Sequence, residues 1–164
     1  MRFCQLGIKA GQRGVTLVEL IIALLILGIL ASAVLPMAEV TATRSREFEL
    51  RRALRDMRTA IDNWKADYDR AVKEKKIIAS INESGYPESL EKLVEGNDWG
   101  GLYPSKRKYL RRIPVDPFDE YQQGWGLRAY QDEPDSTVYG GGDVYDVYTQ
   151  SDRTALDGTE YRSW

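Results

Sequence analysis

The stretch GVTLVELIIALLILGILASAVLP, residues 14–36, decides how this chain of 164 residues is built. Within it, residues 15–35 carry a single charge, that of Glu19. As a helix, these residues rise about 31 Å at ~1.5 Å per residue, which is enough to cross a hydrocarbon core of about 30 Å. We therefore predict a membrane-spanning helix over residues 15–36.

Residues 1–14, which precede this run, form a basic leader with three Lys or Arg residues and no acidic residue. Basic flanks are kept on the cytoplasmic side, so we expect the chain after the span to be exported. An ordinary secretory signal has a shorter apolar region that ends in a small-residue cleavage site. Here the small-residue candidate, residues 31–33, lies inside the run, which favours a retained anchor over a removed signal.

Glu19 is the anomaly of the apolar run. A carboxylate deep in a membrane helix costs roughly 2.5–3.5 kcal/mol on insertion scales. In one interpretation Glu19 lies near the cytoplasmic interface and its side chain reaches water. In the other, the chain is cut after Gly14, and the new α-amine of Val15, on the same or a neighbouring subunit, neutralises the carboxylate.

After Met37 the composition becomes charged, but helical periodicity continues. No Gly or Pro interrupts residues 37–79, so we predict an amphipathic continuation of the helix over this range. We expect the whole helix to be about 55–60 residues long, counted from residue 15. Apolar residues recur at steps of three and four, as in a helix with one buried stripe. The stripe, which we expect to form domain core, consists of Leu50, Leu54, Met57, Ile61, Trp64, Tyr68 and Val72.

The opposite face of this second helical half is mostly basic. It carries Arg44, Arg46, Glu47, Arg51, Arg52, Arg55 and Arg58. One interpretation is a solvated face with i,i+4 ion pairs such as Glu47–Arg51. The other is a set of charge contacts between protomers.

Residues 80–164 read as a small globular α+β domain. We predict a short helix over residues 87–95 and two strands over residues 125–131 and 143–150, where bulky apolar and polar residues alternate. The intervening Gly-, Asp- and Ser-containing segment is typical of a hairpin loop. The predicted fold is a long N-terminal helix packed on a small C-terminal antiparallel sheet.

Composition excludes several function classes. The chain has no His, which removes Ser-His-Asp and Cys-His nucleophile systems, and Cys4 alone cannot form an internal disulfide. A net charge of −2 is a poor basis for binding duplex nucleic acid, so we expect no such partner. A membrane-anchored enzyme would need a carboxylate pair in a domain too small for an obvious cleft, and we predict no enzyme. The candidates for such a pair are Asp143, Asp146, Asp152 and Asp157.

Gly14, the following Val-Thr-Leu-Val-Glu sequence and the long apolar helix resemble the class III signal of type IV pilins and type II secretion pseudopilins. The resemblance implies cleavage after Gly14 by prepilin peptidase and methylation of the Val15 amine. It makes Glu19 the assembly carboxylate at mature position five. It also places Pro36 where many pilins have a proline that loosens the helix.

The C-terminal domain resembles more narrowly the major pseudopilins of type II secretion. The resemblance rests on Tyr86–Leu93, Tyr109–Phe118, Trp125–Tyr130 and Asp143–Thr149. It implies a structural, homo-oligomeric subunit of a helical pseudopilus, anchored by one span in the inner membrane with a periplasmic domain. Its expected partners are minor pseudopilins, prepilin peptidase and the inner-membrane assembly platform.

Two alternatives to a pseudopilus subunit stay open. The first is a type IV pilus subunit for motility, adhesion or DNA uptake, although many type IV pilins carry a C-terminal disulfide that this chain cannot form. The second is an unprocessed single-pass anchored binding protein, which would keep residues 1–14.

The same resemblance implies one calcium ion in the loop after the last strand. Calcium takes six to eight oxygen ligands, a mixture of carboxylates and carbonyls. The candidate ligands are Gln150, Ser151, Asp152, Asp157 and Thr159. The competing interpretation is that the two aspartates cap turns, since Asp157-Gly158 is a common turn pair.

Overall fold

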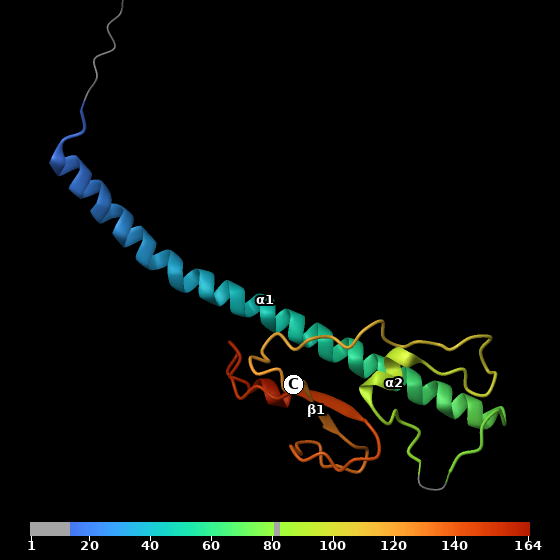
Figure 1. The fold of residues 1–164 in the computed structure, drawn as a ribbon. Helices are drawn as coiled ribbons and strands as arrows, with labels where there is room; N and C mark the ends of the chain where they lie inside the picture. Colours follow the sequence, from blue (N-terminus) through green and yellow to red (C-terminus); the bar gives the residue numbers. More distant parts are fainter. Residues whose placement is uncertain (1–13, 81–82) are drawn as a thin grey trace, which may run out of the picture. The chain divides into compact units, whose positions relative to one another are not determined.

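The computed structural model describes residues 14–80 and 83–164, except for the side chains of residues 33, 35 and 36. It contains α1 (Leu17–Lys73), α2 (Leu90–Glu95), β1 (Trp125–Arg128), β2 (Asp146–Thr149) and a 3-10 helix, η1 (Tyr161–Ser163) (Figure 1). The predicted leader, apart from Gly14, lies outside the described residues. The chain divides into two compact units, one up to residue 41 and one from residue 42 to residue 164.

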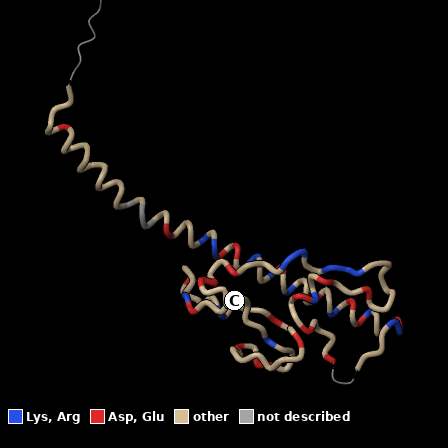
Figure 2. The backbone as a smooth tube through the Cα atoms, in the orientation of Figure 1, with Lys and Arg blue, Asp and Glu red and all other residues tan. Residues whose placement is uncertain are grey.

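The first unit consists of the apolar half of α1. Its large side chains are exposed, for example Leu17 at 75% and Ile29 at 63%. In Figure 2 this half is free of charge colouring except at its start and near its end. Among the described residues, α1 is the one helix long and apolar enough to span a membrane, with a mean hydropathy of 2.8 in its most apolar window. An apolar surface of this extent needs lipid or other helices to cover it.

The second unit is built around the charged half of α1. The predicted stripe is buried from Leu50 to Trp64, which confirms its interpretation as core, and Tyr68 packs partly buried beside it. Three small residues, Ala53, Ala60 and Ala71, are buried on the same helix. Side chains from the later loops and strands cover this face, including Leu93, Phe118, Val147 and Tyr161.

Helix α1 is 57 residues long, which confirms the predicted length of about 55–60 residues, and it ends at Lys73, six residues before the end of the predicted segment at residue 79. Lys75 adopts a left-handed backbone with φ of 58°. The Lys76 N–H donates to the Ala71 carbonyl at 2.8 Å, and the Lys75 N–H donates to the Val72 carbonyl at 3.0 Å. This pair of bonds is a Schellman cap, which satisfies the last carbonyls of the helix without the glycine that usually signals it.

The sheet has two antiparallel strands among the described residues, with Trp125 opposite Thr149 and Arg128 opposite Asp146. Both strands are shorter than the predicted ranges 125–131 and 143–150. The carboxylate of Asp132 accepts hydrogen bonds from the N–H groups of Ala129 (2.7 Å) and Gly140 (3.0 Å) and so turns the chain away after β1. With the long helix, this sheet makes the predicted α+β, pilin-like arrangement.

A buried carboxylate on α1 fixes the loop that follows α2. Asp67 is 5% exposed and accepts hydrogen bonds from the hydroxyls of Tyr103 (2.8 Å) and Tyr109 (2.6 Å). It also pairs with Arg107 at 2.8 Å. The indole N–H of Trp99 donates to the Tyr109 hydroxyl at 2.7 Å. Burial and the bond to Asp67 raise the pKa of Tyr109, so the phenol remains a neutral donor at neutral pH.

We predict that Asp67→Asn lowers the free energy of unfolding by about 1.5–3 kcal/mol, because hydrogen bonds to a charged acceptor are lost. The matched control is Asp62→Asn on an exposed position of the same helix, expected within about 0.5 kcal/mol of the parent. Urea unfolding of the detergent-solubilised chain measures both. Equal effects of the two substitutions would contradict the anchoring role of Asp67.

Candidate processing and assembly site

The predicted scissile bond lies in an exposed, non-helical segment. Gly14, Val15 and Thr16 precede α1, and Val15 is 70% exposed. Exposed segments outside regular structure are the preferred sites of proteolysis, because the backbone can adopt the conformation that a protease binds. The Gly14–Val15 bond is therefore placed where a peptidase can reach it without unwinding the helix.

Helix α1 begins with half of a capping box, a signal that the sequence interpretation of Glu19 did not consider. Thr16 is the N-cap residue: its Oγ1 accepts the N–H of Glu19 at 3.2 Å, and its carbonyl accepts the N–H of Leu20 at 3.1 Å. The pattern Thr-x-x-Glu before an apolar run is the sequence signature of such a start. Glu19 thus lies in the first turn, where the helix dipole favours a negative charge.

Glu19 also interrupts an otherwise uncharged surface. Between Gly14 and Ala38 it is the one ionisable side chain that the structure describes. The dipole and the cap lower the cost of its charge, but that charge still lies beside exposed Leu17 and Val18. If cleavage follows Gly14, the new α-amine stands on the residue just before the cap, at the same end of the helix. An amine and a carboxylate then share one otherwise apolar helix end.

Pro36, the other predicted assembly residue, belongs to the helical backbone of α1, and its side chain lies outside the described residues. Its role in loosening the helix stays a prediction.

The basic face of α1 does not form one continuous charged surface, and one predicted pair on it is wrong. Glu47 is 9% exposed and faces the domain, where it accepts hydrogen bonds from the Leu156 N–H (2.8 Å) and the Tyr161 hydroxyl (3.0 Å). It therefore does not pair with Arg51, which instead contacts Asp157 at 3.1 Å. Burial and the bond to Glu47 raise the pKa of Tyr161 to about 12.

Arg58 makes a tertiary ion pair that the sequence does not reveal. Its guanidinium pairs with Asp146 of β2 at 2.6 Å and donates to the Trp164 backbone oxygen at 2.6 Å. Arg128 of β1 adds a second ion pair to Asp146 at 3.2 Å. These pairs join residues far apart in the chain, so no local pattern reveals them. Arg44, Arg46 and Arg55 are exposed and make no ion pair in the described part of the chain.

The five predicted calcium ligands do lie together in the loop after β2, but the structure engages most of them otherwise. Asp152 pairs with Arg162, and Asp157 pairs with Arg51. The Thr159 hydroxyl donates to Asp157 Oδ1 at 2.6 Å. Because these oxygens are already bound to other groups of the chain, they are not free to coordinate a calcium ion, and the loop fits such an ion poorly. In the described ranges, no group of three or more Asp, Glu, Cys or His side chains is placed to hold a metal ion. The calcium site stays a prediction.

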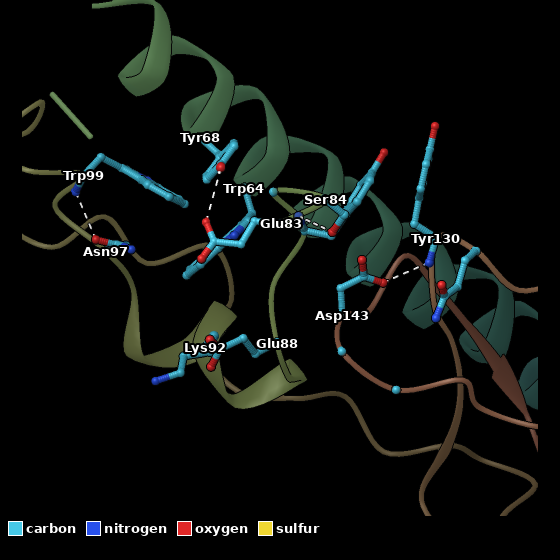
Figure 3. Close-up of a pocket in the computed structure, with 15 residues that line it drawn as sticks. Trp64, Tyr68, Glu83, Ser84, Glu88, Lys92, Asn97, Trp99, Tyr130 and Asp143 are labelled. Atoms are coloured by element: carbon cyan, nitrogen blue, oxygen red, sulfur yellow. Dashed lines mark hydrogen bonds between the residues drawn. The ribbon is translucent and has the colours of Figure 1, made fainter. Parts of the chain in front are cut away.

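The carboxylates considered for catalysis are likewise engaged. A pocket of about 670 Å³ is lined by Trp64, Tyr68 and Trp99, among other residues. Figure 3 shows its lining side chains. Asp143 lines it and accepts the Tyr130 N–H at 2.8 Å. The three other aspartates of the proposed catalytic set each pair with an arginine. In the part of the chain that is described, these four residues therefore form no free carboxylate pair of the kind that glycoside hydrolysis uses.

Of the whole chain, the N-terminal region alone matches a known family. Residues 9–35 match the family described as Prokaryotic N-terminal methylation motif. The matched range contains the exposed Gly14–Val15 bond, the capping Thr16 and Glu19. No curated protein and no solved structure matches the chain.

A prepilin-type motif implies processing by a prepilin peptidase and assembly into a filament, and it favours a structural subunit over an enzyme. The predicted scissile bond lies in an exposed, non-helical segment, where a peptidase can reach it. Over residues 9–35 the chain thus carries the N-terminal methylation motif of type IV pilin-like proteins, which supports its membership of that family.

Proposed function

We propose that this chain is a structural subunit of a type II secretion pseudopilus, cleaved after Gly14 and polymerised through the apolar half of α1. The proposal rests on the match of residues 9–35 to the methylation motif. The predicted scissile bond before α1 is exposed, and the apolar side chains of α1 after it are exposed as well. The mature subunit waits in the inner membrane with its domain in the periplasm. It then exchanges lipid contacts for contacts with other copies of α1.

The C-terminal domain favours a pseudopilus over a surface pilus. Its motifs at residues 86–93, 109–118, 125–130 and 143–149 resemble those of major pseudopilins. Its C-terminal tail is held by packing and by ion pairs, with Tyr161 only 1% exposed. A disulfide, which in many surface pilins closes this region, is not available to it.

Glu19 is assigned the role of partner for the Val15 amine of a neighbouring subunit. In a filament, an unpaired carboxylate among packed apolar helices would carry a desolvation penalty of several kcal/mol. A subunit that brings an amine to it removes that penalty and fixes the axial register of the two helices. Prepilin peptidase acts before this step, because the amine exists only after cleavage.

The first test is the intact mass of the protein from membranes with and without prepilin peptidase. We expect loss of residues 1–14, with one added methyl group on the new terminus. Retention of Met1–Gly14 beside an active peptidase would contradict processing and leave the anchored binding protein as the better interpretation. Where cleavage occurs, rescue of protein secretion, and not of surface piliation, in a strain lacking its major pseudopilin identifies the pseudopilus. The opposite rescue identifies a pilus subunit.

The second test separates the two contributions of Glu19. Glu19→Gln removes the charge, and Thr16→Ala removes the cap but leaves the charge. We expect both variants to be cleaved, Glu19→Gln to lose filament formation, and Thr16→Ala to assemble with helix stability reduced by about 1 kcal/mol. Filament formation is measured by chemical crosslinking of the subunits in intact cells, followed by immunoblot. Equal loss of assembly in the two variants would mean that an intact helix start, and not the charge of Glu19, controls assembly.

A further inference from the structure

The loop between β2 and η1, residues 150–160, is the place where the pseudopilin resemblance implies a cation. The loop closes on itself through two backbone bonds, from the Ala155 N–H to the Thr159 carbonyl (2.7 Å) and from the Gly158 N–H to the Ala155 carbonyl (3.0 Å). Gly158 has a positive φ of 87°, as the turn requires. The carboxylates of Asp152 and Asp157 flank this turn, so the loop concentrates negative charge.

One guanidinium joins two of the oxygens proposed as calcium ligands. Nη2 of Arg162, in η1, donates to the Gln150 carbonyl at 3.4 Å and to Asp152 Oδ1. Arg162 is thus a cation supplied by the chain, placed ten residues after the carboxylate that it binds. A guanidinium offers five N–H donors in a fixed plane, which suits a carbonyl and a carboxylate presented together.

A second guanidinium engages the other carboxylate. Arg51 of α1 donates to Asp157 Oδ2 at 3.1 Å. The Cζ atom of its guanidinium lies 3.9 Å from the centre of the Trp164 ring. Asp157 Oδ1 accepts both the N–H (3.0 Å) and the hydroxyl of Thr159. The Thr159 hydroxyl in turn accepts the Trp164 indole N–H at 2.7 Å. The oxygens of Asp157 and Thr159 are therefore committed to a network that ends on α1.

The surrounding charge also opposes a metal ion. A third arginine, Arg153, belongs to the loop and pairs with Glu120 at 3.3 Å. The backbone is held from the helix side as well, because buried Glu47 accepts the Leu156 N–H. Each exposed ion pair contributes little on its own, but together they neutralise the loop and attach it to α1 and η1.

We propose that two arginines of the chain replace the calcium ion that the resemblance implies and hold this loop in its folded conformation. Arg162 binds Gln150 and Asp152, and Arg51 binds Asp157. A calcium ion would need six to eight oxygens at 2.3–2.6 Å, and so would have to displace both arginines. The loop consequently folds without metal. This inference goes beyond the proposed function and does not depend on it, since it concerns the folded subunit and not the filament.

The test is hydrogen exchange of residues 150–160 in the full chain in detergent, with EDTA or with calcium at about 5 mM. That concentration exceeds the Kd of about 10⁻⁴–10⁻³ M of weak extracellular calcium modules. We expect the parent chain to exchange equally in both conditions. In EDTA, Arg162→Gln should exchange about two- to five-fold faster, the factor that an exposed ion pair supports.

Asp152→Asn provides the second variant, because Asp152 is exposed and its replacement leaves the core intact. It should accelerate exchange by a similar factor, and the double variant should add little, since both changes remove one contact. Arg112→Gln, at an exposed arginine without an ion pair among the described residues, is the matched control and should match the parent. Slower exchange of the parent in calcium would overturn the inference. So would variants at residues 152 and 162 that match the control.

Discussion

The uncovered apolar surface of α1 before residue 41 is the constraint on which the rest depends. Its described Leu, Ile and Val side chains from Leu17 to Val34 are half or more exposed, and the unit to which they belong contains no other described element. Such a surface is stable in lipid, where the hydrophobic effect keeps it out of water, or against other apolar helices, where side-chain packing holds it. A segment that is stable both in a bilayer and in a bundle of its own copies can transfer from the bilayer to the bundle.

The globular unit depends on the same helix for a different reason. Its sheet has two short strands in the described ranges, and an isolated two-stranded hairpin is marginally stable at best. The stripe from Leu50 to Trp64 supplies the apolar face against which the strands and loops pack. Two buried carboxylates of α1, Glu47 and Asp67, then accept donors from the loops and fix their positions. The domain is thereby organised along the helix that also anchors it.

The sequence predicts those features that come from a local, periodic pattern of residues. The long helix, its apolar stripe and the positions of both strands follow from periodicity, and the fold class was correct. The end of α1 was missed because Lys75 adopts the left-handed conformation that glycine normally marks. Glu47 was placed on the solvated face because i,i+4 spacing suggested a pair with Arg51, whereas tertiary donors claim it.

Contacts between distant residues could not be predicted. Arg58 meets Asp146, and Asp67 meets Arg107, only after the chain has folded back on α1. For the N-terminal site the balance is different, because Gly14, Val15 and Glu19 lie within one local motif. There the sequence names the candidate residues, and the structure adds the cap by Thr16 and the exposure of Val15 at the predicted scissile bond.

The central claim is that the Glu19 carboxylate and the Val15 amine of a neighbouring subunit form an ion pair in the assembled filament. Solid-state NMR of filaments grown from a mixture of subunits, half labelled with ¹⁵N at Val15 and half with ¹³C at the Glu19 carboxyl, measures this separation directly. An ion pair with nitrogen and oxygen within about 4 Å, as the account predicts, places the ¹⁵N nucleus close enough to the carboxyl ¹³C of the neighbouring subunit to give a measurable dipolar coupling between them. A filament that forms with no measurable coupling between the two labels would contradict it.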